Sequence, residues 1–449
     1  MKRIWKPWLS VCLAFFLVFG FGACAANGLA KSGRAPMGAE DYYGGFAADG
    51  MAEAAMAGKA EGYAGEAEPE ENKSETVVRP AAGQITAGAQ DDNRYYAQWL
   101  KLFAAAEPSP VDEQTAENAE TSEVAKAAGK FYRYLSNPWG MDSQRRVTVT
   151  VRSGGAPVAG AKVVCRNGDE TAFRAVTNAN GVAYLFPDCE SGTLTVESGS
   201  NTATAAFDGE NRDVTVELGG SVEKADVIEL MFVVDVTGSM GDEISYLKSE
   251  LADVVRQVAS ANAGAKINLA FLFYRDAEDS VPFKYVDFKD VTVKKNLTAQ
   301  LKELDKQKAD GGGDYPEAVD EALEQAVSKQ WSANATKLIF LVLDAPPHDG
   351  QQYQTRFANA VRSAVEQGIR VCPVLASGAD LLCEYTTRSA ALLTGGTFVF
   401  VTDDSGIGGS HYDPDLPNVT VEYLNACMVR LINGYHTGTF ADPVAWRGQ

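Results

Sequence analysis

Two kinds of hydrophobic pattern alternate along the second half of the chain. Continuous apolar runs such as VIELMFVVD (227–235) and KLIFLVLDA (337–345) are typical of strands that are buried on both faces of a parallel sheet. Between such runs, apolar residues recur at helical spacing, as in ISYLKSELADVVRQV (244–258). The alternation predicts a doubly wound α/β domain with a mostly parallel sheet over residues 225–437.

A period of two governs the preceding segment, residues 143–220. Val147, Val149 and Val151 share one face of a predicted strand, with threonines between them, and TNANG (177–181) marks a turn. Several short strands at regular spacing predict a small all-β sandwich in front of the α/β domain.

This segment resembles the carboxypeptidase-regulatory-like, immunoglobulin-like family, and the resemblance rests on PVAGAKV (157–163) and TNANGVAYLF (177–186). It implies a spacer or binding module without catalytic residues. Cys165 and Cys189 both lie in this segment and could form a disulfide in an oxidising compartment.

The first residues have the pattern of an export signal. Lys2, Arg3 and Lys6 precede a short apolar run, and small residues close it. FGAC (21–24) resembles the bacterial lipobox, which implies that residues 1–23 are removed and that Cys24 is lipidated. We therefore expect an exported protein that is lipid-anchored in the cell envelope. Ordinary cleavage after Ala23 or Ala25, without lipidation of Cys24, is the alternative.

Three further segments differ in composition from the two predicted domains. Residues 24–90 are rich in Gly, Ala and Glu, which predicts a flexible tether. Residues 91–142 form a partly helical connection, and apolar residues in DDNRYYAQWLKLF (91–103) favour docking on the folded body. Residues 438–449 are a short C-terminal tail.

The overall charge narrows the class of partner. Acidic residues outnumber basic ones 60 to 40, which gives a formal net charge of -20. Nucleic acid is bound chiefly by neutralising phosphates, so this charge argues against it as a partner, and the membrane is expected to be met only through the lipid anchor.

Candidate chemistry lies at the ends of the predicted strands. Asp235, Thr237 and Ser239 alternate directly after one strand, Asp344 ends another, and Asp314 lies in the glycine-rich stretch ADGGGDYPEA (309–318). Ligands of an open α/β sheet bind at the carboxyl ends of its strands. A set of oxygen donors without Cys or His suits Mg²⁺, with Mn²⁺ or Ca²⁺ as alternatives.

These motifs resemble the metal-ion-dependent adhesion site of von Willebrand factor type A domains, in which D-x-S-x-S follows a strand. The resemblance implies that Asp235, Thr237, Ser239 and Asp344 hold the cation. It also implies a binding protein, not an enzyme, whose protein or surface-polymer ligand supplies the last oxygen to the cation. An acidic side chain of the ligand could be the source of this oxygen.

Asp314 departs from the family pattern, which has a threonine in this loop. Asp235 and Asp344 together would neutralise a dication, and a third direct carboxylate would weaken attraction for an acidic ligand. Either Asp314 acts outside the first coordination sphere or the ligand is neutral.

Other interpretations stay open at this stage. Ser239 could cap the following helix, with Asp242 at the capping-box position, and Asp344 could be a turn residue. An assembly scaffold with a purely structural cation is one alternative function, and a metal-assisted hydrolase is another. The sequence contains no phosphate-binding loop, no G-x-S-x-G and no H-E-x-x-H motif.

Overall fold

The computed structural model describes residues 81–105, 128–136, 139–219, 226–411, 414, 416 and 419–448. The predicted signal segment, Cys24 and most of the predicted tether lie outside these residues. Within the described ranges, every helix is too short or too polar to cross a lipid bilayer.

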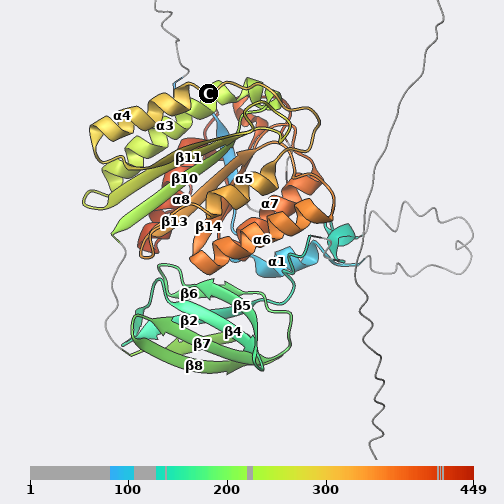
Figure 1. The fold of residues 1–449 in the computed structure, drawn as a ribbon, viewed down its shortest axis with the longest axis vertical. Helices are drawn as coiled ribbons and strands as arrows, with labels where there is room; N and C mark the ends of the chain where they lie inside the picture. Colours follow the sequence, from blue (N-terminus) through green and yellow to red (C-terminus); the bar gives the residue numbers. More distant parts are fainter. Residues whose placement is uncertain are drawn as a thin grey trace, which may run out of the picture. The chain divides into compact units, whose positions relative to one another are not determined.

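The predicted α/β domain is built on one large sheet (Figure 1). Within the described residues this sheet has eight strands in the order β12-β11-β10-β13-β14-β15-β1-β16, and the five from β11 to β15 in this order are parallel. The doubly wound fold is therefore confirmed. The strands are β1 (Thr86–Gln90), β10 (Val227–Asp235), β11 (Lys266–Tyr274), β12 (Phe283–Asp290), β13 (Thr336–Leu343), β14 (Ile369–Leu375), β15 (Phe398–Val401) and β16 (Glu422–Tyr423).

Helices cover both faces of the sheet, which is why its central strands carry mostly apolar residues on both faces. In β10, Met231 and Val233 pack into one hydrophobic cluster, and Phe232 and Val234 pack into the other. One face carries α3 (Ile244–Ala261), α4 (Lys294–Asp305) and α8 (Leu424–Thr437); the other carries α5 (Val319–Val327), α6 (Gln351–Gln367) and α7 (Leu381–Thr394).

The first strand of the described residues, β1, contradicts one prediction made from the sequence. Residues 86–90, assigned above to the tether, form strand β1, which pairs antiparallel with β15 from Ala87–Val401 to Gln90–Phe398. The prediction that the tether extends to residue 90 is therefore wrong. The backbone of β1 completes the ladder, and this stabilisation does not depend on branched apolar side chains.

The segment after β1 docks as its apolar residues predict. It contains α1 (Tyr96–Lys101), and Trp99 of this helix is fully buried against Phe103 and Phe131. Phe103 and Phe131 in turn contact Tyr385 of α7. Tyr132–Tyr134 form a short 3-10 helix (η1).

The predicted all-β segment consists of two four-stranded sheets. One sheet has the order β3-β2-β6 with β9 beside β2, and the other has the order β5-β4-β7-β8. Alternate residues of β2 are buried, as the period of two predicts. The strands are β2 (Val147–Ser153), β3 (Ala156–Pro157), β4 (Lys162–Asn167), β5 (Glu170–Val176), β6 (Val182–Leu185), β7 (Gly192–Ser198), β8 (Asn201–Phe207) and β9 (Asp213–Glu217).

The sandwich packs against the α5–α7 side of the α/β domain. Its buried residues belong to the same hydrophobic cluster as those of α6 and α7. A further contact reaches the end of α8, where Asn180 donates a hydrogen bond of 2.8 Å to the carbonyl of Gly438, the C-cap residue. Cys165 and Cys189 are buried free thiols here, and Cys189 is close enough to raise the pKa of Cys165, after the larger effect of burial. Their disulfide stays a prediction.

Candidate metal centre

The loop that follows β10 turns its polar side chains onto one another. Asp235 Oδ1 accepts hydrogen bonds from the backbone N–H of Thr237 at 2.9 Å and from its hydroxyl at 2.7 Å. The same hydroxyl lies 3.0 Å from Ser239 Oγ. Asp235 and Thr237 are buried, whereas Ser239 is exposed. The three oxygen-bearing residues therefore form a connected row that leads from the interior to the surface.

The glycine-rich loop lies directly against this row. Gly238 donates to the Gly311 carbonyl at 3.0 Å, and Asp310 N–H donates to the Val236 carbonyl at 3.0 Å. Gly311 and Gly312 have φ angles of 79° and 78°, in the left-handed region that glycine adopts at little cost. This backbone conformation allows the second loop to approach Thr237 closely.

Glu317, rather than Asp314, is the acidic residue that this loop brings to Thr237. A Cβ placed on Gly312 would lie 2.7 Å from Glu317 Oε1 and 3.2 Å from Thr237 Cβ, so both side chains border the same small space. Glu317 is buried, and its Oε2 has no hydrogen-bond partner in the part of the chain that the structure describes. Its N–H donates to the Pro346 carbonyl at 3.0 Å, which ties it to the loop after β13.

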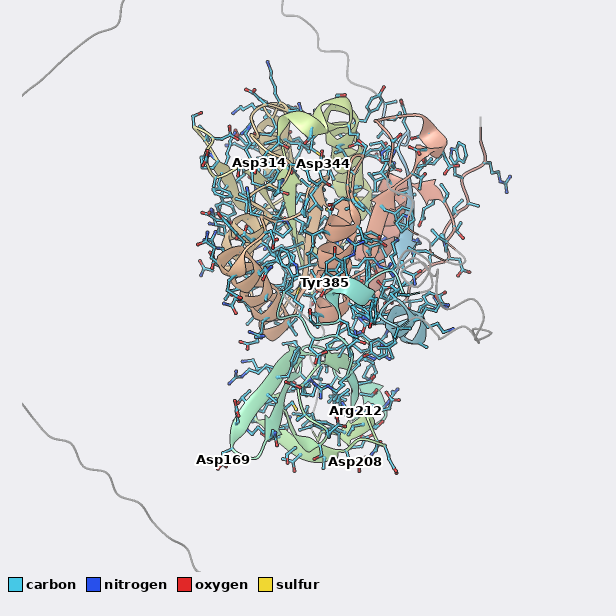
Figure 2. The ribbon with its side chains drawn as sticks, turned by 90° about the vertical axis from the view of Figure 1, so that its right-hand side faces the viewer. Asp169, Asp208, Arg212, Asp314, Asp344 and Tyr385 are labelled. Carbon is cyan, nitrogen blue, oxygen red and sulfur yellow. The ribbon has the colours of Figure 1, made fainter. Side chains whose placement is uncertain are left out.

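Asp344 begins that loop, directly after β13, and is buried. Strands β10 and β13 are parallel neighbours that pair in register up to Val234–Val342, so their carboxyl ends meet at the same edge. Figure 2 shows Asp344 and Asp314 at the same end of the domain. The structure thus brings Asp235, Thr237, Ser239 and Asp344 together at this edge, as the sequence predicts.

The structure places Asp314 in a different group. Its side chain is 63% exposed, and its Oδ1 lies 3.7 Å from His348 Nε2, which is also 3.7 Å from Asp276 Oδ1. Within the described residues, these three offer ligand atoms that all lie within 4.8 Å of one another. Asp314 therefore belongs to a neighbouring acidic cluster on the surface side, which agrees with an outer role rather than direct ligation next to Asp235.

The helix-cap interpretation of Ser239 does not hold. Helix α3 begins at Ile244 with Glu243 as its N-cap residue and without a side-chain capping hydrogen bond. A short 3-10 helix, η2 (Gly238–Asp242), separates Ser239 from α3, and Thr237, its N-cap residue, makes no capping bond either. The hydroxyls of this loop are therefore left for a role other than capping.

The electrostatics of the buried carboxyl groups favour a cation between them. Burial, and then the charge of Asp344, raise the pKa of Asp235 to about 7, although hydrogen bonds from Thr237 lower it. Burial and the charges of Asp235, Asp276 and Asp344 raise the pKa of Glu317 to about 9. Asp235 Oδ2 accepts no hydrogen bond of normal geometry, although the Tyr274 hydroxyl is close enough to lower the pKa further. Buried oxygens of this kind fit a hard divalent cation, which would replace the protons.

This coupling predicts a pH dependence of metal binding. The pKa values of Asp235 and Glu317 are higher in the folded chain than in the unfolded one, so the metal-free protein binds more protons when folded. Its stability should therefore fall as pH rises from about 4 towards 9. Because the cation displaces these protons, Mg²⁺ affinity should rise over the same range, by up to about tenfold per pH unit for each proton displaced. Calorimetric titration at pH 6, 7 and 8 measures this, and a pH-independent affinity would contradict it.

Two residues of this region have weak sequence signals. Glu317 follows Pro316 near the end of the glycine-rich stretch. A carboxylate this close to the start of a predicted helix is a weak indication of a functional role. Asp276 follows β11, so the rule that ligands gather at strand ends also covers it. Neither residue is part of the D-x-T-x-S motif.

Comparison with known proteins agrees with this geometry. Residues 229–391 match the family model described as von Willebrand factor A domain. The match supports a VWA domain in this chain. The matched range begins within β10 and ends within α7, so it contains Asp235, Glu317 and Asp344.

Curated relatives of this chain are distant and much longer. Alpha-protein kinase vwkA of Dictyostelium discoideum is 25% identical over 165 residues, which cover 37% of this chain and 25% of the kinase. The putative ariadne-like RING finger protein R811 of Acanthamoeba polyphaga mimivirus is 28% identical over 160 residues, 34% of this chain and 15% of that protein. The chain thus spans a quarter or less of the length of these relatives.

Two similar solved structures come from bacteria. The pilus adhesin SpaC of Lactobacillus rhamnosus GG is 12% identical, with 46% of this chain and 29% of SpaC covered and a TM-score of 0.31. The conserved hypothetical protein BatB of Bacteroides thetaiotaomicron is 17% identical, with 39% of this chain and 90% of BatB covered and a TM-score of 0.26.

Proposed function

We propose that this chain is an exported, lipid-anchored binding protein whose VWA domain uses a divalent cation, Mg²⁺ first of all, to hold a protein or surface-polymer ligand. Asp235, Thr237, Ser239, Asp344 and Glu317 would hold the ion. One observation supports this most: the unsatisfied, buried Oδ2 of Asp235 stands at the inner end of a row of oxygens whose outer end, Ser239, is exposed. A cation held there could be reached by a ligand from solution.

Binding without turnover is part of the proposal. The buried carboxyl groups at this edge are the ones that would hold the cation, which leaves them unsuited to act as a general base. The adjacent sandwich would serve as a spacer that presents the VWA domain, as its family resemblance implies. The cation would polarise and orient an oxygen of the ligand, while Asp235 and Thr237 keep the loop in position.

The charge of the site bears on the chemistry of the ligand. Asp235, Asp344 and Glu317 together carry one negative charge more than a dication neutralises, once all are ionised. An acidic side chain would then be repelled at short range in a partly buried site. The arrangement therefore favours a neutral oxygen donor, such as the hydroxyl groups of a surface polymer or a protein carbonyl.

A binding assay under metal control tests the proposal. Beads coated with the purified full chain are expected to adhere to at least one of a panel of immobilised cell-surface polysaccharides and extracellular proteins in Mg²⁺, and to detach in EDTA. Beads coated with Asp235→Asn protein should not adhere. Adhesion that persists in EDTA would favour a scaffold with a structural cation. Cleavage of a panel member, lost in the variant, would favour the hydrolase.

The lipid anchor has a separate test at Cys24. In a bacterial host, the wild-type chain is expected in the membrane fraction, and Cys24→Ser is expected to move it to the soluble exported fraction because no acyl chain can be attached. Cys12→Ser, in the apolar part of the signal, is the matched control and should leave the distribution unchanged. Equal membrane association of all three proteins would rule out this anchor.

A further inference from the structure

A cavity lies at the amino ends of the central strands, opposite the metal centre, where the sandwich meets the VWA domain. It has a volume of about 370 Å³, at the small end of the range for ligand pockets. The sandwich contributes the β3–β4 loop and the end of β5, and the VWA domain contributes the starts of β13 and β14 and the end of α8. Its VWA residues lie at the amino ends of β13 and β14, whereas the metal centre lies at the carboxyl ends of β10 and β13.

Two nearly buried cations line the cavity. Lys337 and Arg370 are the second residues of the adjacent strands β13 and β14, and they are 7% and 9% exposed. Burial is the largest cause that lowers the pKa of both groups, and Arg370 lowers that of Lys337 further. Two positive charges that repel each other in a partly dry site are costly unless an anion joins them.

Among the described residues that line this cavity there is no carboxylate, although the chain as a whole is strongly acidic. Among the described residues, neither Lys337 nor Arg370 forms an ion pair. Lys337 donates to the Gln367 carbonyl at 2.8 Å, and Arg370 donates to the Gly368 carbonyl at 3.3 Å. Glu229 acts on Lys337 at longer range, but its own oxygens accept hydrogen bonds from Ser332 at 2.6 and 2.8 Å.

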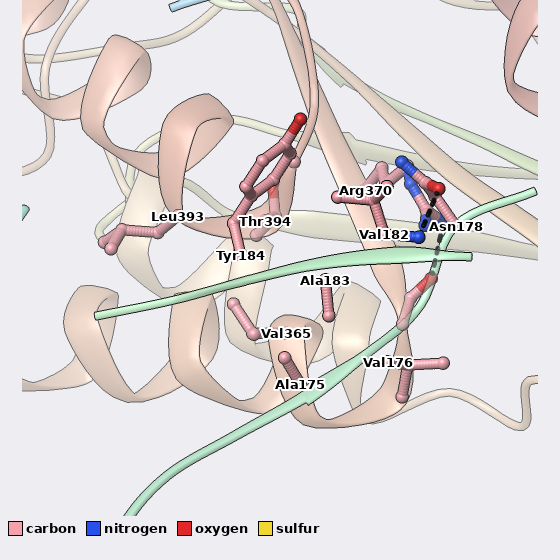
Figure 3. A pocket seen from close by; sticks show the side chains of 12 residues that line it. Ala175, Val176, Asn178, Val182, Ala183, Tyr184, Val365, Arg370, Leu393 and Thr394 are labelled. Carbon is pink, nitrogen blue, oxygen red and sulfur yellow. Dashed lines mark hydrogen bonds between the residues drawn. The ribbon is translucent and has the colours of Figure 1, made fainter. Parts of the chain in front are cut away.

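Polar groups suited to an oxyanion surround the two cations. His436 lines the cavity, with its Nδ1 3.1 Å from Thr336 Oγ1, and Asn178, Asn334 and Thr437 also contribute to the lining. Arg370 also lines a smaller adjoining pocket, where Figure 3 shows it beside Asn178 of the sandwich. A guanidinium has five N–H donors, so one carbonyl contact leaves Arg370 most of its donor capacity.

We propose that this cavity binds a small organic molecule that carries a phosphate or carboxylate group. The anionic group lies between Lys337 and Arg370, and the rest of the molecule contacts the apolar residues of the sandwich loops. The ligand would therefore join the sandwich to the VWA domain. The alternative is a purely structural role, in which Lys337 and Arg370 stabilise the interface between the domains through hydrogen bonds to backbone carbonyls.

The test uses inorganic phosphate and malonate as probes of the two anionic groups. Each is titrated into the purified full chain at constant ionic strength, and binding is followed by calorimetry and by the thermal midpoint. At least one probe should bind saturably and raise the midpoint, and the better probe identifies the group. If neither exceeds the effect of chloride at equal ionic strength, the proposal is overturned.

Variants separate a binding site from a structural contact. Asn334→Asp adds a negative charge at the exposed lip of the cavity and should weaken binding about tenfold. Asn211→Asp is the matched control, because Asn211 lies on an exposed turn of the sandwich outside the cavity lining. This variant should bind the probe as tightly as the wild type does. Lys337→Met removes a buried charge, so the midpoint without probe should stay or rise while the response to the probe is lost. A lower midpoint with an unchanged response would show a fastening role and overturn the proposal.

Discussion

Replacing Asp235 by asparagine is expected to abolish saturable Mg²⁺ binding, with a loss of affinity of at least about 100-fold. Even groups that only orient metal ligands account for about 10- to 100-fold of the metal affinity. Asp235 supplies more than orientation, because its buried Oδ2 accepts no hydrogen bond of normal geometry from the described residues. Calorimetric titration of Mg²⁺ and Mn²⁺ into the full chain measures the effect. The metal-free variant should also be at least as stable as metal-free wild type, because one buried carboxyl group is removed.

Asp314→Asn is the matched control, since it makes the same chemical change at an exposed position beside His348. It should change Mg²⁺ affinity by no more than a few fold through long-range charge, whereas Glu317→Gln should lower it strongly. If Asp314 proved essential and Glu317 dispensable, Asp314 would be a direct ligand of the cation, and the choice of Glu317 would be wrong. Unchanged binding in Asp235→Asn would remove the metal centre itself.

The site residues that the sequence predicts are those whose positions are set by a regular strand. Asp235 is the last residue of one apolar strand, and Asp344 directly follows another. Because these two strands are parallel neighbours in register, their carboxyl ends lie side by side. Thr237 and Ser239 are within a few residues of Asp235, so local geometry decides their positions. These four residues could be predicted because the regular part of the fold places them.

Asp314 and Glu317 show where such reasoning stops. Both lie in a loop whose path depends on left-handed glycines and on backbone contacts to Val236 and Pro346. The irregular backbone between Asp314 and Glu317 determines which of the two carboxylates is buried. The hydrophobic periodicity of the sequence does not predict this direction. Motif spacing therefore located the loop but not the inward-facing side chain.

Strand β1 shows a second limit. Its sequence, TAGAQ, contains no branched apolar residue. Composition therefore assigns this strand to the tether. Gly88 fits because a Cβ there would lie 2.4 Å from the Phe400 ring, so the small residue is required by close packing. The pairing partner, β15, is more than 300 residues away in sequence. Long-range pairing of this kind leaves no local pattern.

A buried ion-pair network holds the segment after β1 in place. Arg388 of α7 donates to both carboxylate oxygens of Asp92, at 2.6 and 2.9 Å, and to Glu384 at 3.0 Å. Its guanidinium also lies over the rings of Trp99 and Phe131, 5.4 and 5.6 Å from their centroids. The arginine thus links α7 to the docked N-terminal segment through charge and through aromatic contacts.

Arg388→Ala should therefore lower the free energy of unfolding by about 3–5 kcal/mol, because it leaves two carboxylates buried without this partner. Urea denaturation of the full chain measures the loss. Arg362→Ala, on an exposed position of α6, should change stability by no more than about 0.5 kcal/mol. Adding Asp92→Asn to Arg388→Ala should recover part of the loss, since the uncompensated charge is then gone. If the arginine variant lost less than about 1 kcal/mol, or if Asp92→Asn recovered nothing, the aromatic packing rather than the ion pair would hold this segment.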